Sequence, residues 1–326
     1  MILGRGRVII AGEKLVIPGR ARKTMSFSSQ EVFFFARNEK YQNWLKRQPL
    51  SEQTRRAYRS RINHFLSFLG TSGEDLERLL ENTRERAFVL GEYTRHLKKQ
   101  YKVRPSTVNA YLTAIDHFLQ FAGAGPSKVS REELPQEAPR ALTKDEQKRF
   151  LRAAMSSRRT KDRAVALLLF YTGIRIGECA ALNTEDIAIG GRKNRIIIRT
   201  GKGNRYREIP LNSEAREALN EWILERNRKF NTEETSEALF LNPQGQRLST
   251  ASLDLIVRKT GQACGLEISA HVLRHTCLTN LVRNGADLVL VAEIGGHKRL
   301  ETTRRYSLPS TTDKEAAMER LISPGR

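Results

Sequence analysis

The chain has 326 residues and a formal net charge of +21, with 57 Lys and Arg against 36 Asp and Glu. Because 39% of its residues are hydrophobic, it can form real cores, which excludes a disordered polycation. Its length favours two domains. Residues 1–140 contain 25 basic and 14 acidic side chains, and the remainder contains 32 and 22. Positive charge shared by two folded halves indicates a protein that binds a polyanion with both, and nucleic acid fits better than a membrane surface.

The three cysteines, Cys179, Cys264 and Cys277, form no disulfide framework and fit a reducing compartment. The N-terminal segment contains basic residues but no apolar run of signal-peptide length. No stretch approaches the roughly 20 apolar residues that span a bilayer. We therefore expect a soluble, cytoplasmic protein.

The first half of the chain reads as an N-terminal extension, residues 1–27, followed by a helical domain, residues 28–122. The extension is rich in Gly and Arg, and its two short apolar runs fit either a small hairpin or an extended arm. In the domain, apolar residues recur at three- and four-residue steps, as in Tyr58, Ile62, Phe65, Leu66 and Leu69. This spacing predicts four or five helices.

A linker separates this domain from the second. The run at 123–126, Gly-Ala-Gly-Pro, breaks any helix, and we place the linker at 123–140. Thr143 and Glu146 then have the spacing of a capping box, in which each side chain accepts from the other's backbone N–H. A second domain is therefore predicted from residue 141.

In the second domain, the spacing of the apolar residues changes from a helical period to a strand period and back. Helices are predicted near 144–156, 161–171, 215–223, 250–263, 270–284, 287–294 and 299–306, with a last amphipathic segment at 313–322. Between them, residues 195–211 read as strand, tight turn and strand. The predicted fold is mainly α: an all-helical first domain and a mixed α/β second domain with a small antiparallel sheet.

One helix start carries a candidate anion site. If Ser269 caps the helix, His271 and Arg274 lie three residues apart and share a face. Free N–H groups, the helix dipole and a planar guanidinium would all favour a phosphate there. A packed or solvated surface turn explains the pair equally well.

His271 and His275 also have the four-residue spacing of zinc-binding helices. Val272 stands where a zinc protease carries its glutamate base, and the cysteines complete no recognised ligand spacing. We therefore expect no metal, and we expect His275 to be a buried, hydrogen-bonded histidine rather than a catalytic one.

Two further residues stand at unusual positions. Arg175 lies between two glycines at a helix junction, where it either caps carbonyls or serves a ligand, and Glu178 is placed to orient it. Tyr306 ends a strongly basic segment, residues 298–306. It is either a half-buried aromatic residue or a nucleophile held among cations.

Six residues of the second domain form an ordered set: Arg175, Lys202, His271, Arg274, His297 and Tyr306. In chain order they read Arg, Lys, His-x-x-Arg, His, Tyr. The sequence resembles the tyrosine recombinase family, the phage integrase-like enzymes, over roughly residues 30–306. The resemblance is strongest in TGIRIGE, HVLRH and the closing GH…TxxY segment, which are specific as a set. The segments 51–58 and 106–111 also resemble the two helix starts of the family's core-binding domain.

The resemblance implies a catalytic domain at 141–306 and the chemistry of DNA strand exchange. Tyr306 would attack the scissile phosphate and form a 3′-phosphotyrosyl link with a free 5′-hydroxyl. Arg175 and Arg274 would hold the non-bridging oxygens, which agrees with the need for fixed cations in phosphoryl transfer. The covalent link conserves the phosphodiester energy, so no metal and no nucleotide cofactor are implied.

Three further roles follow from the resemblance. His271 would help to take the tyrosine proton, since a tyrosine of pKa near 10 is a weak nucleophile without a base. His297 would hydrogen-bond the phosphate. Lys202, at the turn of the predicted hairpin, would protonate the leaving 5′-oxygen, because a lysine can release a proton and an arginine cannot. Lys193 on the same strand system competes with Lys202 for this assignment.

The sequence departs from the family pattern just before His297. The family has an apolar residue where Gly295 stands. We expect the glycine to loosen local packing without touching the chemistry.

The resemblance also implies how DNA is bound. A C-shaped clamp would place one domain on each side of double-stranded DNA, and four protomers would assemble as a homotetramer on two recombination sites. The candidate phosphate contacts of the first domain are Arg55, Arg56, Arg59, Lys98, Lys99, Lys102 and Arg104. The extension is too short for a separate arm-binding domain. The tail, residues 307–326, either docks on a neighbouring protomer or packs on its own domain.

Three other functions compete with site-specific recombination. A type IB topoisomerase-like enzyme would nick and close single duplexes with the same residues. A catalytically silent, sequence-specific DNA-binding protein is disfavoured because all six catalytic positions are filled. A metal-dependent nuclease is disfavoured because the sequence contains no clustered carboxylate site.

Overall fold

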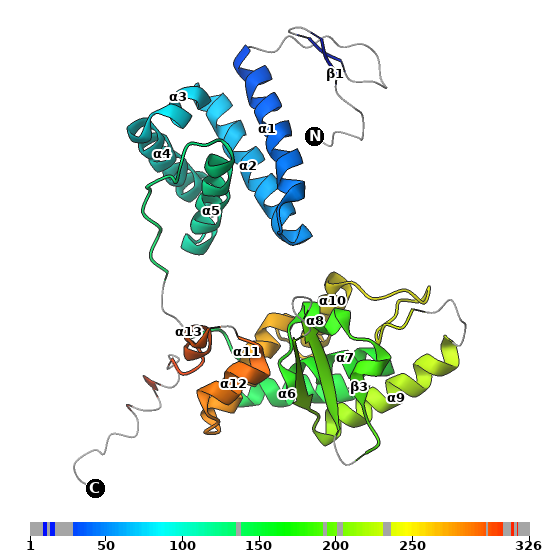
Figure 1. The fold of residues 1–326 in the computed structure, drawn as a ribbon. Helices are drawn as coiled ribbons and strands as arrows, with labels where there is room; N and C mark the ends of the chain where they lie inside the picture. The colour runs from blue at the N-terminus through cyan, green and yellow to red at the C-terminus, as the bar shows by residue number, and fades with distance from the viewer. Residues whose placement is uncertain are drawn as a thin grey trace, which may run out of the picture. The chain divides into compact units, whose positions relative to one another are not determined.

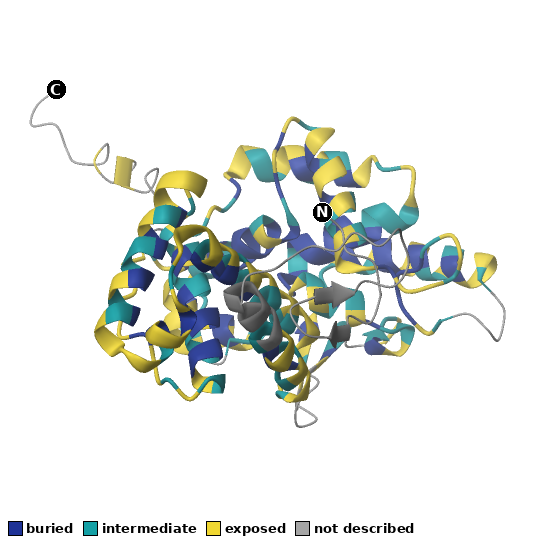
Figure 2. Cartoon of the chain, turned by 90° about the horizontal axis from the view of Figure 1, so that it is seen from above, coloured by how far each residue is buried: buried dark blue, intermediate teal, exposed yellow. Residues whose placement is uncertain are grey.

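The computed structural model describes residues 9–11, 14–16, 29–134, 138–191, 194–200, 205–230, 236–297, 299–308, 314–315 and 318. The chain divides into two compact units, Met1–Pro135 and Gln136–Arg326 (Figure 1). The division falls inside the stretch 123–140 that the sequence predicts as a linker. In each unit, buried and exposed residues alternate along most of the helices (Figure 2).

The described residues of the first unit include five helices, within the predicted four or five. They are α1 (Ser29–Arg47), α2 (Glu52–Ser72), α3 (Leu76–Glu81), α4 (Thr83–Tyr101) and α5 (Pro105–Phe121). The predicted periodic residues of α2 fill the core, with Ile62, Phe65 and Leu69 fully buried. Ser51 accepts a hydrogen bond from the Thr54 backbone N–H and so caps α2.

The N-terminal extension contains a two-stranded antiparallel hairpin. Strands β1 (Ile9–Ala11) and β2 (Lys14–Val16) pair with Ile9 opposite Val16. The two short apolar runs of the sequence therefore pair as strands, and of the two predicted conformations the hairpin is observed.

Two tyrosines of the first unit are fully buried and bonded to histidines. The Tyr41 hydroxyl lies 2.9 Å from His117 Nδ1, and the Tyr93 hydroxyl lies 2.7 Å from His64 Nδ1. Burial raises the pKa of both tyrosines and lowers the pKa of both histidines. Both pairs are therefore neutral, structural hydrogen bonds.

The second unit packs its helices around α7, of which residues 164–170 are buried without interruption. Its helices are α6 (Lys144–Met155), α7 (Thr160–Thr172), α8 (Ile176–Ala181), α9 (Ser213–Lys229), α10 (Thr250–Gln262), α11 (Ala270–Arg283), α12 (Leu288–Gly295) and α13 (Leu300–Arg304), with a 3-10 turn η1 (Thr184–Asp186). The continuous apolar run of α7 explains its central place, since a helix that is apolar all round must be buried.

A three-stranded antiparallel sheet with the order β3-β4-β5 lies beside these helices. The predicted strands are observed as β4 (Arg195–Thr200) and β5 (Arg205–Pro210), with Ile196 opposite Ile209. Strand β3 (Ile187–Ala188) pairs with β4 and was not predicted, because two residues show no alternation. The residues of the turn, 201–204, lie outside the described part of the chain.

Two of the predicted helix ends can be compared directly. The capping box is confirmed: Thr143 N–H donates to Glu146 Oε2 at 2.8 Å, and Glu146 N–H to Thr143 Oγ1 at 3.2 Å. The helix start at Ser269 is confirmed, but its side chain does not cap the helix. Ser269 occupies the N-cap position of α11 without a side-chain bond, and the Ala270 N–H donates instead to Asp254 of α10 at 2.9 Å. The Asp254 carboxylate therefore accepts the bond from a backbone N–H that the sequence analysis expected to be free to bind an anion.

The C-terminal end of the chain is described only in part. Helix α13 is shorter than the predicted 299–306, and of the predicted segment 313–322 only Lys314, Glu315 and Met318 are described, in helical conformation. Among the described residues, no helix is both long and apolar enough to cross a membrane.

Candidate active site

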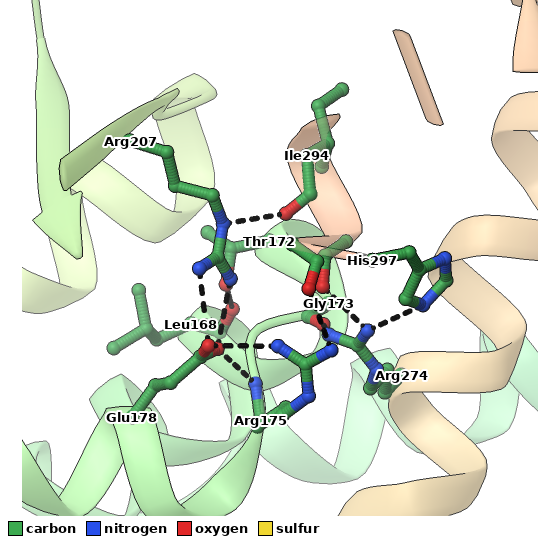
Figure 3. Close-up of polar contacts among 11 residues, drawn as sticks. Leu168, Thr172, Gly173, Arg175, Glu178, Arg207, Arg274, Ile294 and His297 are labelled. Atoms are coloured by element: carbon green, nitrogen blue, oxygen red, sulfur yellow. Dashed lines mark hydrogen bonds and ion pairs between the residues drawn. The ribbon is translucent and has the colours of Figure 1, made fainter. Parts of the chain in front are cut away.

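Arg175 is held at the junction of α7 and α8. Gly173 ends α7 in a left-handed conformation with φ of +60°, and Arg175 then occupies the N-cap position of α8. Its backbone N–H donates to Glu178 Oε2 at 2.8 Å, and its Nη1 donates to Glu178 Oε1 at 2.9 Å (Figure 3). The expectation that Glu178 orients Arg175 is confirmed.

Glu178 also binds an arginine that the sequence analysis did not single out. Arg207 of β5 donates through Nη1 and Nη2 to the two Glu178 oxygens at 3.0 and 2.8 Å, and through Nε to the Ile294 carbonyl at 3.0 Å. Burial alone would raise the pKa of Glu178, but the bonds from Arg207 and Arg175 outweigh it and lower the pKa. Strand alternation is the signal that would have found Arg207, because it shares a face with buried Ile209.

Arg274 of α11 lies deepest in the site, with 5% of its surface exposed. Its Nη1 donates to the Gly173 carbonyl at 2.7 Å, and its Nη2 donates to the Gly295 carbonyl at 2.6 Å. The same Nη2 lies 2.8 Å from His297 Nε2. Burial and the nearby Arg175 lower the pKa of Arg274. The guanidinium is thus fixed from α7 and α12 at once, as Figure 3 shows.

Gly295 contacts this arrangement directly. A Cβ added there would lie 3.1 Å from His297 Cε1 and 3.3 Å from Arg274 Nη2. Gly295 thus lies against two of the predicted catalytic residues, and the expectation that it loosens packing without touching the chemistry stays a prediction. The residue is buried, and its missing side chain allows the guanidinium and the imidazole to approach the end of α12.

His297 follows α12 and is neutral. Its backbone N–H donates to the Ala292 carbonyl at 2.9 Å, and its Nδ1 lies 2.7 Å from Oγ1 of buried Thr303. Burial and the charges of Arg274 and Arg175 lower the pKa of His297 to about 4. Since a guanidinium can only donate, His297 Nε2 accepts from Arg274, and Nδ1–H donates to Thr303.

Tyr306 is buried, with 6% of its surface exposed, and lies beside His297. The two rings are parallel with centroids 5.8 Å apart. Burial raises the pKa of Tyr306, while the charges of Arg274 and Arg305 act to lower it. The ring is therefore buried, and cations lie around it.

The hydroxyl of Tyr306 meets the histidine pair of α11. His275 Nδ1 lies 3.1 Å from the hydroxyl, and His275 Nε2 lies 2.7 Å from His271 Nε2. The expectation of a buried, hydrogen-bonded His275 is confirmed. The sequence did not show that its partner is Tyr306.

The structure thus brings together five of the six predicted catalytic residues: Arg175, His271, Arg274, His297 and Tyr306. They come from four separate stretches of the second unit. Lys202 and its competitor Lys193 lie outside the described residues. The two histidines of α11 bond each other, and within the described part of the chain no group of three or more His, Cys, Asp or Glu could hold a metal ion.

The seven candidate phosphate contacts all belong to the first unit. Those with exposed side chains are Arg56, Lys98, Lys99, Lys102 and Arg104. Arg55 and Arg59 are half-buried. Arg55 donates to the Leu50 carbonyl at 2.7 Å, and Arg59 donates to Gln42 at 2.7 Å.

Comparisons with known proteins agree with this arrangement. The Phage integrase family model matches residues 140–312. A tyrosine recombinase XerC from Mycobacterium tuberculosis is 30% identical over 278 residues, which is 83% of this chain and 92% of that protein.

Two solved structures share the fold. A crystal structure of the XerH site-specific recombinase bound to its difH substrate aligns with a TM-score of 0.65 at 21% identity, covering 91% of this chain and 86% of that one. A lambda integrase dimer bound to a COC′ core site aligns with a TM-score of 0.58 at 18% identity, covering 82% and 96%. The mainly helical fold, the matched family region and the identity along the chain lead to one conclusion: this chain belongs to the phage integrase family and is a tyrosine recombinase, an enzyme that acts on DNA sites.

Proposed function

We propose that Tyr306 is the nucleophile of this recombinase. Its Oη attacks the scissile phosphorus, the bond from phosphorus to the 5′-oxygen breaks, and a 3′-phosphotyrosyl link remains. Reversal of these steps by a 5′-hydroxyl from a second duplex rejoins the DNA. The energy of the phosphodiester is kept in the link, so the chemistry balances without a nucleotide.

The observation that carries this proposal is the convergence of two guanidiniums and a neutral imidazole next to the tyrosine. Arg274 Nη2 lies 2.8 Å from His297 Nε2, and the His297 ring is parallel to that of Tyr306. Arg175 reaches the same segment through its bond to the Gly296 carbonyl at 2.9 Å. Donors that are already fixed in place stabilise the negative charge that develops on the phosphoryl group during its transfer, because they need not reorganise in the transition state.

Arg175 and Arg274 then hold the non-bridging oxygens. His297 hydrogen-bonds the phosphate by exchanging the bond that its Nε2 accepts from Arg274 for a bond that a protonated Nε2 donates to the phosphate. His271 serves as the proton acceptor for the tyrosine, and Lys202 protonates the leaving 5′-oxygen. Both arginines carry carbonyl bonds in the free protein, which orient them before DNA arrives. Preoriented charge is the main contribution that a protein can make to phosphoryl transfer.

The partner of this site is double-stranded DNA, and we extend the proposal to the assembly. Four protomers on two recombination sites provide the four tyrosines that cleave the four strands of a full exchange, and each tyrosine is regenerated when its strand is rejoined. Phosphate contacts come from the exposed basic residues of the first unit, and the net charge of +21 supports such binding. We place the reaction in the cytoplasm, in line with three free cysteines.

A covalent-adduct experiment tests the nucleophile. The protein is incubated in EDTA with supercoiled DNA that carries the sequence around its own gene, and the reaction is stopped with SDS. We expect protein attached to DNA, with the attachment mapped to Tyr306 by mass spectrometry and lost in Tyr306→Phe. Tyr93→Phe is the matched control, because Tyr93 is also a buried tyrosine bonded to a histidine.

The same reaction separates recombination from the other functions. Exchanged product between two copies of the mapped site supports site-specific recombination, and relaxed circles without exchange would support a topoisomerase-like enzyme. Tight sequence-specific binding without any adduct would overturn the proposal in favour of a silent DNA-binding protein.

A further inference from the structure

His275 is a buried residue that connects Tyr306 to solvent through hydrogen bonds. Its Nδ1 lies 3.1 Å from the Tyr306 hydroxyl, and its Nε2 lies 2.7 Å from His271 Nε2. Tyr306 and His275 are buried, with 6% and 7% of their surface exposed, whereas His271 is an exposed residue. The three side chains form one path from the buried hydroxyl to water.

The family resemblance assigns the proton of the tyrosine to His271, but in this structure the nitrogen at the hydroxyl belongs to His275. A general base must lie within hydrogen-bond reach of the proton that it removes. His275 Nδ1 meets this requirement, and His271 Nε2 is bonded to His275 instead. An intermediary is therefore needed if His271 is the final acceptor.

We infer that His275 is a further catalytic residue, a proton relay between Tyr306 and His271. This inference rests on the proposed function of Tyr306 as the nucleophile. In cleavage, the O–H bond of Tyr306 breaks as Oη bonds phosphorus, and the proton passes to His275 Nδ1. The proton on His275 Nε2 passes at the same time to His271 Nε2, and His271 releases its Nδ1 proton to water.

The chain of bonds has two self-consistent proton arrangements, and they match the two directions of the reaction. In one, Tyr306 donates to Nδ1 of His275, and Nε2–H of His275 donates to His271. In the other, His271 donates to His275, and Nδ1–H of His275 donates to the tyrosine oxygen. The first is ready for cleavage. The second returns a proton to the tyrosine when it leaves during rejoining.

The charges around His275 favour passing a proton on rather than keeping it. His271 and Arg274 face it from α11, His297 faces it from the end of α12, and Arg305 lies beside Tyr306. Burial and these neighbours lower the pKa of His275 to about 3. A protonated His275 is thus short-lived, and the proton moves on to exposed His271.

Two substitutions separate a relay from a structural role. His275→Gln keeps a polar group near Nε2 and loses the one at Nδ1, whereas His275→Asn keeps a group near Nδ1 and loses the one at Nε2. A relay needs both nitrogens. We expect both variants to lower the single-turnover cleavage rate about 100-fold, with DNA affinity unchanged. The probe is a nicked suicide duplex built around the attachment point mapped for the wild-type enzyme.

Solvent isotope measurements add a readout that packing does not affect. In mixtures of H₂O and D₂O we expect the cleavage rate of the wild type to curve with deuterium fraction, because several protons move together. In either His275 variant the dependence should become linear, and the rate should rise about tenfold per pH unit as tyrosinate forms unaided. His117→Gln is the matched control, since it removes the partner of Tyr41 in the first unit.

The outcomes are distinguishable from failure of the proposed function. If the wild type forms no adduct at Tyr306, the function itself is overturned before any variant is made. If the wild type forms the adduct and both His275 variants cleave at its rate or faster, the relay is overturned. If only His275→Asn cleaves DNA at the wild-type rate, the relay is overturned as well, because His275 would then serve only to position Tyr306.

Discussion

Each unit of this protein buries tyrosines against histidines, but only one of them surrounds such a pair with cations. In the first unit, Tyr93 bonds His64 at 2.7 Å within a cluster of aromatic rings. In the second unit, Tyr306 bonds His275 at 3.1 Å beside Arg274 and Arg305. Burial raises the pKa of both tyrosines, and only at Tyr306 do nearby positive charges oppose the rise.

The difference shows that a buried Tyr–His pair is not by itself a catalytic feature. A neutral Tyr–His pair without neighbouring cations contributes one hydrogen bond to the stability of the fold. The pair at Tyr306 differs in two features: guanidiniums lie nearby, which in the proposed reaction stabilise the tyrosinate and the phosphate, and His275 bonds the exposed His271. The cations can be altered or displaced, the histidines can be protonated, and a Tyr–His pair that lacks both features can be broken as a comparison.

The largest effect should come from Arg274→Lys, which keeps the charge and removes the planar fork. Lysine cannot reach the carbonyls of Gly173 and Gly295 and a phosphate at once. We expect the single-turnover cleavage rate to fall about 10²- to 10³-fold. Arg226→Lys is the matched control, because Arg226 is also buried and bonds the carbonyls of Ala238 and Ser236 away from the site. Equal losses of cleavage in both variants would show that the arginine acts through stability alone.

A smaller effect should follow from Gly296→Ala, which disturbs the cations without removing them. Gly296 has φ of +62°, and a Cβ there would lie 2.7 Å from Arg207 Nη1 and 3.1 Å from Arg175 Nη1. Gly285→Ala shares the strained φ, at +85°, but meets nothing within 4 Å. We expect both variants to lose about 1–2 kcal/mol of stability. Only Gly296→Ala should also slow cleavage, by about 10- to 100-fold. Denaturant unfolding and cleavage assays on both proteins check this, and slow cleavage by Gly285→Ala would contradict it.

Stability should fall as the pH falls below about 6.5, the pKa of histidine in the unfolded chain. The pKa values of His275 and His297 are lowered to about 3 and about 4, and those of His64 and His117 are also lowered. The unfolded state therefore binds more protons between pH 6.5 and about 4, which favours unfolding by at most about 1.4 kcal/mol per pH unit for each histidine. Urea midpoints between pH 7.5 and 5 measure the slope. A midpoint that rises toward acid pH would refute the assignment of neutral histidines.

The smallest effect should come from Tyr41→Phe in the first unit. The variant loses the hydrogen bond between the Tyr41 hydroxyl and His117 Nδ1. We expect a loss of about 1 kcal/mol in the free energy of unfolding and an unchanged cleavage rate. A change in cleavage would mean that the Tyr–His pairs of the first unit also serve the reaction, and the comparison of the two units would fail.

Most of the architecture was predictable from local patterns. A helical first unit of four or five helices, the strands β4 and β5, and the capping box at Thr143 followed from periodicity and short-range spacing. Errors appeared where a distant element decided the outcome. Asp254 replaced the expected cap at Ser269, and β3 was too short to show a pattern.

The candidate site divides in the same way. The sequence by itself pointed to Arg175, Arg274, His297 and Tyr306, because they stand in motifs that resemble those of the tyrosine recombinase family, and their roles in phosphate binding and nucleophilic attack are our proposal. Only the tertiary structure decided that Arg207 anchors Glu178, that Gly295 makes room for Arg274, and that His275 meets Tyr306. The physical reason is that hydrogen bonds between residues far apart in the chain depend on where packing places whole helices, and local spacing does not contain that information.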